Sequence, residues 1–446
     1  MKIPQIKNAL RNIKGTCEER LRKLYPAGLP ALAEERYRME LSYLETSEQV
    51  NGFEIYRCLV RESEKCAGYV TIRGTAGGSF LIYLMGHSLV NPLPAHYYCP
   101  KCGHFEVMGT EVLGSDLPRC SCPSCGSALR ADGCNLPVES VWGVDGKKQI
   151  DFDFNANRGM FPFAEKLLTK LFPQNSVVPY GMLSQRDGRV FMDQQGFLLL
   201  PLGRTMEDYE DLKDYLDDGE ECLSGNLQVL EKNFLYRVMV NPNELCDVLV
   251  SMQQRTGTYI RELMCVDISS ITWKDIVNTR LYPVISEIPA SIFRMVKPKN
   301  FLEMLSLEAY GHSSYADCQK EDAYSSAMAR VELLQSSEFS EYGIYSREDV
   351  FDFLTGIGFN REKAFEVMEF VRMGKAGRKS EELEKILEGY ELPKRMECVF
   401  KKCLYLFSRA HCACYLFDYA RLAVYMKMDS RGFSQVLKSY GMISLK

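Results

Sequence analysis

The spacing of apolar and polar positions predicts mixed α and β structure in the first part of the chain. Apolar residues recur with an approximate 3.6-residue period over residues 32–50, which predicts a helix, and residues 1–25 read as another. The mixed segment 52–62 fits either a helix or a strand. The β-branched run 69–72 predicts a strand that leads into a glycine-rich turn, and the apolar segment 80–85 predicts a helix.

Apolar runs further along predict three more strands, over residues 150–154, 196–202 and 234–240. From about residue 284 the pattern becomes helical to the end of the sequence. The helices predicted there span residues 349–354, 361–373, 380–388, 395–406 and 411–426. Strands followed by a helical region favour an α+β class.

Two CxxC pairs stand out against this background. Cys99 and Cys102 form the first pair, and Cys122 and Cys125 form the second. Each pair supplies two thiolates from a tight turn, and four thiolates satisfy a tetrahedral Zn²⁺ ion whose role is structural. Cys120 adds a C-x-C spacing and is the alternative to Cys122. The sequence therefore predicts a closed zinc site within residues 96–135.

Composition and charge narrow the class of protein. The 446 residues are enough for two to four domains, and the formal net charge of −5 excludes a general polycation, so any nucleic acid would have to bind a local basic face. Seventeen cysteines with one metal-type cluster fit a reducing cytoplasm better than a disulfide network. No apolar run is long enough to span a membrane, and we expect no membrane partner.

The turn from Arg73 to Ser79 reads Arg-Gly-Thr-Ala-Gly-Gly-Ser and lies between a predicted strand and a predicted helix. Bare backbone N–H groups and a helix N-terminus attract anions, so this segment could cradle phosphate. No Lys-Ser/Thr follows the last glycine, so it is not a Walker A loop. A tight structural turn is the alternative.

Asp151 and Asp153 alternate with apolar residues in Ile-Asp-Phe-Asp-Phe, so we expect both carboxylates on one face of a strand. Such a pair could hold two divalent cations for phosphoryl transfer, a site that usually needs a third carboxylate from another strand. Surface or turn acids are the alternative.

The order of these motifs resembles the polymerase core of bacterial PolC-type DNA polymerase III alpha subunits. The stretches that carry the resemblance are residues 68–79, 91–100, 116–118, 122–126, 132–133, 150–155, 370–375 and 406–415. The likeness is close over roughly 27–160 and 345–427, and faint between them.

The resemblance implies an α+β fold: a polymerase-beta-like nucleotidyltransferase palm with an inserted four-cysteine zinc motif and a C-terminal helical fingers domain. The implied division is residues 1–95 for the N-terminal helices and palm entry, 96–135 for the zinc insertion, 136–283 for the rest of the palm and 284–446 for the fingers-like part.

The resemblance also implies roles for individual residues. Asp151 and Asp153 would hold Mg²⁺. The residues that would bind a nucleotide or its phosphates are Arg73, Gly74, Thr75, Gly77, Ser79, Arg372, Lys375, Arg409 and His411.

The sequence departs from that family at three informative points. The third metal-binding aspartate of the family lies in a strand like Leu-Lys-Leu-Asp-Ile-Leu-Gly, and here Met239 stands in its place. A thioether does not bind Mg²⁺, which takes oxygen ligands. Asp247 and Asp267 are the alternative sources of a third carboxylate. Ser306 replaces an arginine of a fingers motif, and the glycine loop is one residue short.

These departures favour a degenerate, weakly active or inactive relative that retains binding of DNA and nucleotide. The alternatives are an active short DNA-directed DNA polymerase that uses two metal ions in replication or repair, and a zinc-containing scaffold protein. Expected ligands are DNA and a deoxynucleoside triphosphate, and the expected setting is a bacterial cytoplasm with replication or mobile-element proteins as partners.

Overall fold

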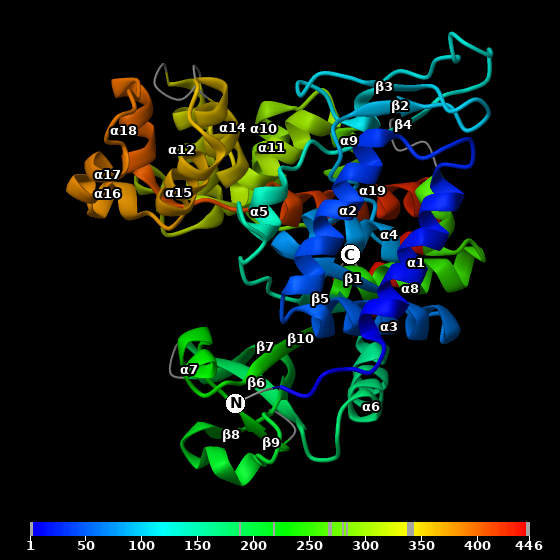
Figure 1. Cartoon of the computed structure of the whole chain (residues 1–446), viewed down its shortest axis with the longest axis vertical. Helices are drawn as coiled ribbons and strands as arrows, with labels where there is room; N and C mark the ends of the chain where they lie inside the picture. The colour runs from blue at the N-terminus through cyan, green and yellow to red at the C-terminus, as the bar shows by residue number, and fades with distance from the viewer. Residues whose placement is uncertain are drawn as a thin grey trace.

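A computed structural model of the chain describes residues 3–186, 189–216, 219–265, 270–278, 281, 284–336 and 343–442. It is a mixed α and β structure whose largest sheet has seven strands (Figure 1). In spatial order these are β1 (Val70–Arg73), β5 (Asp153–Ala156), β10 (Tyr236–Pro242), β7 (Arg189–Leu199), β6 (Val177–Arg186), β9 (Glu221–Leu223) and β8 (Lys213–Tyr215). β5 and β10 run parallel, whereas β1 pairs antiparallel with β5 and β7 antiparallel with β10.

Helices of the N-terminal half cover one face of the β1–β5 region of this sheet. They are α1 (Ala9–Leu24), α2 (Ala31–Thr46), α3 (Val50–Lys65) and α4 (Phe80–Met85). α3 makes the closest approach, because the ring of Tyr56 stacks on Phe154 with centroids 5.8 Å apart. Gly52 permits this approach, since a Cβ there would lie 2.2 Å from the ring of Phe152. The apolar side chains of β5 therefore pack against α3 and are buried.

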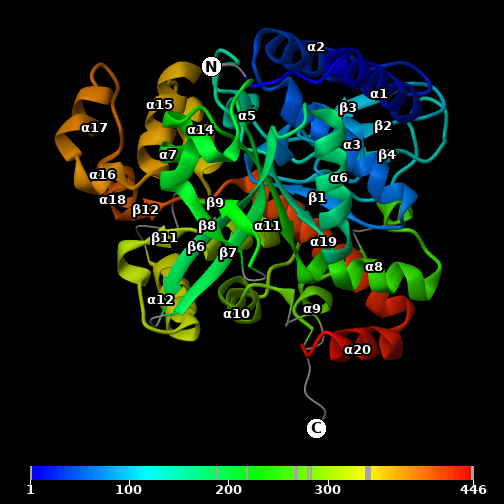
Figure 2. The same cartoon turned by 90° about the horizontal axis from the view of Figure 1, so that it is seen from below.

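The middle of the chain contributes further helices. These are α5 (Val138–Trp142), α6 (Phe161–Leu171), α7 (Leu227–Lys232), α8 (Glu244–Thr256) and α9 (Trp273–Ile276). Strands β6 to β9 and α7 form a lobe at one end of the molecule, with a small apolar cluster of its own (Figures 1 and 2).

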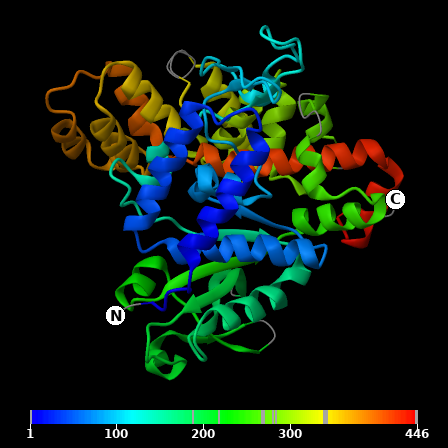
Figure 3. The ribbon, with the colours of Figure 1, turned by 45° about the vertical axis from the view of Figure 1, so that its right-hand side comes forward.

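The C-terminal part is helical, as the pattern predicts. Its helices are α10 (Glu287–Val296), α11 (Phe301–His312), α12 (Ala323–Gln335), α14 (Arg347–Gly356), α15 (Arg361–Arg372), α16 (Lys375–Arg378), α17 (Ser380–Ile386), α18 (Lys394–Lys402), α19 (Arg409–Met428) and α20 (Ser430–Ser439). α19 lies behind the N-terminal helices in Figure 1 and reaches from the α14–α18 group to α8, which Figure 3 shows from another side. None of the helices in the part that the structure describes is long and apolar enough to cross a membrane.

A buried polar cluster fastens α19 to β1. Tyr69 donates to Asp418 at 2.7 Å, and Arg421 donates to the same carboxylate oxygen at 2.9 Å and to the carbonyl of His87 at 2.8 Å. All three side chains of this cluster are buried. Removing one partner of a buried ion pair typically costs about 3–5 kcal/mol, so this cluster fixes the position of α19 against the sheet.

The cysteine-rich segment folds around a three-stranded sheet of β3 (Phe105–Val107), β2 (His96–Tyr98) and β4 (Arg130–Asp132). It is attached to the helical part through Asp116. This carboxylate accepts hydrogen bonds from the N–H groups of Phe301 and Leu302, at 2.6 and 2.9 Å, and so caps the start of α11.

Several predicted elements differ from the observed ones. The helix predicted over 32–50 ends at Thr46 as α2, and Val50 begins α3, which includes the ambiguous segment 52–62. The helix predicted over 395–406 ends at Lys402, because the next residues pair as β12 (Cys403–Tyr405) with β11 (Ser314–Tyr315).

The acidic strand also begins later than predicted. β5 starts at Asp153, and Asp151 precedes it. The backbone N–H of Ile150 donates to the side chain of Gln49 at 2.6 Å, which ties this segment to the start of α3. Its contact with the sheet is the carbonyl of Phe152, which accepts from the N–H of Met239 at 3.4 Å. Only one of the two aspartates is therefore a strand residue.

Gly77 provides a test of the packing between the glycine turn and α19. A Cβ at Gly77 would lie 2.5 Å from the Sγ of Cys414. We expect Gly77→Ala to lower the free energy of unfolding by about 1–3 kcal/mol through overpacking, as measured by chemical denaturation. The control is Gly15→Ala in α1, where a Cβ has nothing within 4 Å, and which should be neutral or stabilising. Equal stability of Gly77→Ala and the unsubstituted protein would contradict this packing.

Candidate functional site

Three predicted site positions lie side by side across the sheet. The register pairs Arg73 of β1 with Asp153 of β5, and Asp153 with Met239 of β10. Residues directly opposite on neighbouring strands point to the same face, so these three side chains form one row. The prediction that Met239 stands where a third carboxylate would be needed agrees with this register.

Asp153 is enclosed between two guanidinium groups. Its Oδ1 lies 3.5 Å from Nη2 of Arg237, and its Oδ2 lies 3.9 Å from Nη2 of Arg73. The side chain is 19% exposed, and Oδ1 makes no hydrogen bond. Arg237 was missed in the sequence analysis, although it lies two residues before Met239 and therefore on the same face of β10.

Asp151 occupies a different setting. Its carboxylate is 3.9 Å from the same Arg237 guanidinium and is largely exposed. It borders a cavity of about 310 Å³ that Arg237 and Glu231 also line. Partial burial raises the pKa of Asp151, the nearby Asp153 raises it further, and Arg237 lowers it.

No third acid completes this pair within the described ranges, where the four cysteines are the one group of metal-ligating side chains close enough to share an ion. Asp247 lies on α8, and its Oδ1 accepts from the backbone N–H of Arg158 at 2.8 Å. Asp267 lies outside the described residues. Met239 is fully buried among the apolar side chains of the β6–β9 lobe.

The arrangement does not fit Mg²⁺. An octahedral Mg²⁺ ion needs oxygen ligands at about 2.0–2.1 Å and an excess of negative charge. Here two carboxylates already face two guanidinium groups, and the third position presents a sulfur. The prediction of a magnesium site at Asp151 and Asp153 is therefore not supported by the donor set.

The glycine turn packs tightly against α19. Gly74 has a φ of 78°, a conformation that favours glycine, and its N–H donates to Nδ1 of His411 at 3.1 Å. Thr75 and Gly77 belong to the 3₁₀ turn η1 (Thr75–Gly78) that follows. The turn thus lies against the start of α19, and both Arg73 and His411 line the same cavity.

Ser79 does not face this site. It is fully buried, its Oγ accepts from the N–H of Ile82, and it donates to Glu40 at 2.5 Å. Glu40 also accepts the N–H of Phe80 at 2.9 Å. The hydroxyl of Ser79 therefore caps α4, which corrects its predicted role as a phosphate ligand.

A cavity of about 670 Å³ opens beside Arg73. Its basic and aromatic lining residues are Arg73, Arg158, His312, Phe407, His411, Tyr415 and Tyr419. The rings form a ladder along α19: His411 stacks on Tyr415 with centroids 5.2 Å apart, and Phe407 meets His411 at 4.8 Å. Asn155, the next polar residue of β5, donates to the hydroxyl of Tyr415 at 2.7 Å. Guanidinium groups beside stacked rings suit a ligand with a phosphate and a planar base.

Three predicted nucleotide-binding residues lie away from this cavity and have other partners. Arg409 donates to Asp349 at 2.7 Å and to Asp352 at 2.9 Å. Arg372 pairs with Glu369 at 2.7 Å, and Lys375 lies 5.9 Å from the ring centre of Phe370. None of the three lines the cavity. Arg409 joins α19 to α14 through its two aspartates, whereas Arg372 pairs within α15.

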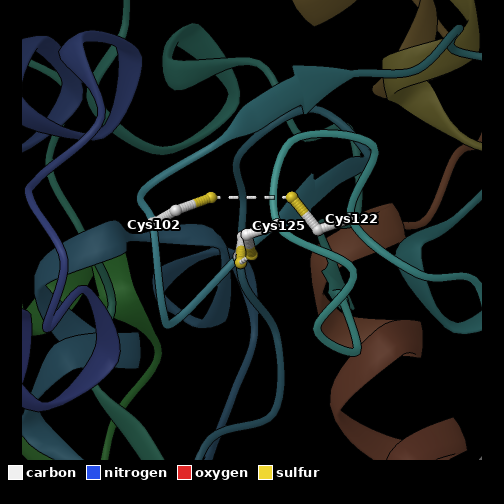
Figure 4. A group of neighbouring side chains, drawn as sticks. Cys102, Cys122 and Cys125 are labelled. Carbon is white, nitrogen blue, oxygen red and sulfur yellow. Dashed lines mark hydrogen bonds between the residues drawn. The ribbon is translucent and has the colours of Figure 1, made fainter.

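The four cysteines converge as predicted. Their Sγ atoms all lie within 4.8 Å of one another, with Cys99–Cys125 at 3.4 Å and Cys102–Cys122 at 3.6 Å (Figure 4). Zn–S bonds of about 2.3 Å place tetrahedral sulfurs about 3.8 Å apart, so the cluster could bind zinc. Cys120 is exposed and outside the cluster, which excludes it as a replacement for Cys122 in this structure. A backbone hydrogen bond from Ser127 lowers the pKa of Cys125 to about 6, as a thiolate ligand requires.

Comparison of the sequence with known proteins finds a family model and several relatives. Residues 11–186 match the family model of the bacterial DNA polymerase III alpha NTPase domain. DNA polymerase III PolC-type of Thermotoga maritima is 23% identical over 482 residues, which cover 95% of this chain and 34% of the relative. The Bacillus subtilis protein of the same name is 25% identical over 476 residues, or 95% of this chain and 32% of the relative. That of Pediococcus pentosaceus is 36% identical over 186 residues, or 40% of this chain and 13% of the relative.

Along most of its sequence the chain is therefore similar to PolC-type bacterial DNA polymerase III, at low identity. The chain covers about a third of the length of the Thermotoga maritima and Bacillus subtilis proteins.

The zinc site can be tested by metal analysis. We expect roughly one equivalent of zinc in protein purified without added metal, and loss of most of it in Cys125→Ser, because structural zinc contributes directly to folding. Cys120→Ser is the matched control and should retain the metal. Less than about a tenth of an equivalent in the unsubstituted protein would contradict a structural zinc site.

We expect the buried side chain of His411 to make the folded protein less stable in acid. Burial lowers its pKa to about 3, and His312, Arg73 and Arg347 lower it further in the same direction. In the unfolded state this imidazole is protonated below about pH 6.5, whereas in the folded state it stays neutral down to about pH 3. The free energy of unfolding therefore falls as the pH drops from about 6.5 toward 3, by up to about 1.4 kcal/mol per pH unit.

His411→Gln should flatten the pH dependence of the unfolding free energy between pH 6.5 and 4, as measured by denaturant titration at several pH values. The same slope in His411→Gln as in the unsubstituted protein would show that His411 can be protonated while folded.

Proposed function

We propose that this chain is a DNA- and nucleotide-binding relative of the PolC polymerases in which magnesium-dependent nucleotidyl transfer is lost or severely weakened. One observation carries the proposal: fully buried Met239 lies opposite Asp153 in the parallel pairing of β5 and β10.

The seven-stranded sheet is, in this proposal, the counterpart of a polymerase-beta-like palm, and residues 284–446 are a fingers-like part. Residues 96–135 form a zinc-bearing insertion between residues 1–95 and 136–283, which together contribute the palm. Support comes from the family match over residues 11–186, which includes β1, β5 and the cysteine cluster.

Loss of the third carboxylate would be costly for catalysis. In a two-metal mechanism, the ions stabilise both the attacking and the leaving oxygen, and their positions depend on shared carboxylates. Removing a single group that stabilises transition-state charge commonly costs about 10²–10³ in kcat. A sheet with Asp153 paired to arginines would lose more, because the ions themselves would bind poorly.

Ligand binding does not require those ions. The 670 Å³ cavity is lined by Arg73, by the rings of His411 and Tyr415, and by Arg158, which is paired with Glu244 of the same lining at 3.3 Å. Base–aromatic stacking is worth about 1–3 kcal/mol per base, and phosphate contacts add affinity that depends on salt. We assign Arg73 and His411 to the ligand side of this cavity. Gly74 and Thr75 belong to the turn that positions Arg73 and do not line the cavity themselves.

Arg372, Lys375 and Arg409 keep a supporting role in this proposal. Their partners are acids or rings of the same helical part, so they would position the walls of the cavity and would not contact the ligand.

An active short DNA polymerase is the second candidate. The presence of both Asp151 and Asp153, close together beside Arg237, favours it. A purely structural zinc-bearing scaffold is the third reading, and the basic, aromatic cavity argues against it. Replication or mobile-element proteins remain the proposed partners.

Primer extension separates these candidates. We expect a fluorescent primer–template to bind, with log affinity falling by about 0.9 for each phosphate contact per tenfold rise in salt, and to show no extension with Mg²⁺ or Mn²⁺ and all four nucleotides. Arg73→Gln should weaken binding, and Arg261→Gln, an exposed arginine outside the cavity, is the matched control.

Extension that Asp153→Ala abolishes would contradict the loss of activity and establish a polymerase. Absence of any DNA or nucleotide binding would contradict the proposal and favour the scaffold.

A further inference from the structure

The carboxylates of Asp151 and Asp153 are already paired with positively charged side chains. The guanidinium of Arg237 lies 3.9 Å from Oδ1 of Asp151 and 3.5 Å from Oδ1 of Asp153. Arg73 approaches the other oxygen of Asp153 at 3.9 Å. Two carboxylates and two guanidinium groups sum to a formal charge of zero.

These arginines are not mobile surface side chains. Arg237 is 10% exposed and Arg73 is 17% exposed, close to the 19% of Asp153. A guanidinium is charged at all relevant pH values, and a nearly buried ion pair is weakly screened by salt. The two positive charges therefore stay beside the carboxylates under ordinary conditions.

The position of a third metal ligand also lacks an oxygen donor. Met239 lies opposite Asp153 and presents a thioether. No further acid, cysteine or histidine joins the two aspartates closely enough to share an ion, over the ranges that the structure describes. A divalent ion would have to displace Arg237 from both carboxylates and would still lack a third protein ligand.

We propose that Arg237 is the resident cation of this site, in the place of a divalent metal, and that the neighbouring cavity binds a phosphate-bearing ligand in its metal-free form. The second half of this statement rests on the proposed function. Arg73 connects the two halves: it faces Asp153 and also lines the 670 Å³ cavity, and its buried Nε has no hydrogen-bond partner. A phosphate oxygen is the kind of acceptor that such a guanidinium binds.

The direct test is Mn²⁺ binding by the full-length, zinc-loaded protein, followed by the EPR signal of free Mn²⁺. The unsubstituted protein should bind Mn²⁺ no more tightly than Asp153→Asn does. The double variant Arg237→Gln with Met239→Asp removes the internal cation and supplies a third carboxylate, and it should bind one Mn²⁺ at least about tenfold more tightly. Adding Asp153→Asn to the double variant should remove that site.

Arg237→Lys with Met239→Asp is the matched control, because it supplies the acid but keeps a positive charge, and it should gain less affinity than the Gln-containing pair. Thermal unfolding checks that each variant folds. If the double variant does not fold, the comparison of the unsubstituted protein with Asp153→Asn still decides. Tight Mn²⁺ binding by the unsubstituted protein that Asp153→Asn abolishes would overturn the inference.

A fluorescent nucleoside triphosphate tests the second half. Its affinity in EDTA should equal or exceed its affinity with saturating Mg²⁺, and Arg73→Gln should weaken it in EDTA. An affinity that rises with Mg²⁺ would overturn metal-free binding. Failure to bind nucleotide or DNA under either condition would overturn the proposed function, whereas the Mn²⁺ result would stand by itself.

Discussion

The charge balance around Asp153 is the constraint on which the interpretation of this protein depends. The pairing of β1, β5 and β10 places Arg73 and Met239 on either side of this carboxylate, and Arg237 reaches it from the same face of β10. A strand register cannot shift by one residue without turning every side chain to the other face. The same backbone pairing that builds the sheet therefore also sets the chemistry of its polar face.

α19 joins this face to the rest of the molecule. The buried cluster of Tyr69, Asp418 and Arg421 holds the helix against β1, and His411 accepts a hydrogen bond from the glycine turn. The cavity exists because these two contacts fix the aromatic side of α19 beside Arg73. The cavity lies next to a carboxylate that is already paired with arginines, which is the physical reason for proposing binding without metal-dependent catalysis.

Much of this arrangement could be predicted from the sequence where a residue type has one strong structural preference. Four cysteines in two tight turns converge on a shared centre, and an apolar run located the strand of Met239. Long polar side chains were less predictable, since a pattern does not reveal their partners. Arg409 was expected to bind a nucleotide, but its guanidinium donates to Asp349 and Asp352. Ser79 was expected to bind phosphate, but its hydroxyl donates to Glu40. Arg237 was overlooked because its importance arises only from its distance to two carboxylates.

Anomalous diffraction from crystals soaked in Mn²⁺ would test the central claim most directly, since it locates the ion and the guanidinium in one measurement. The account predicts no Mn²⁺ peak at Asp151 and Asp153, with Arg237 still between them. A strong peak bridging the two carboxylates, with Arg237 displaced, would contradict it.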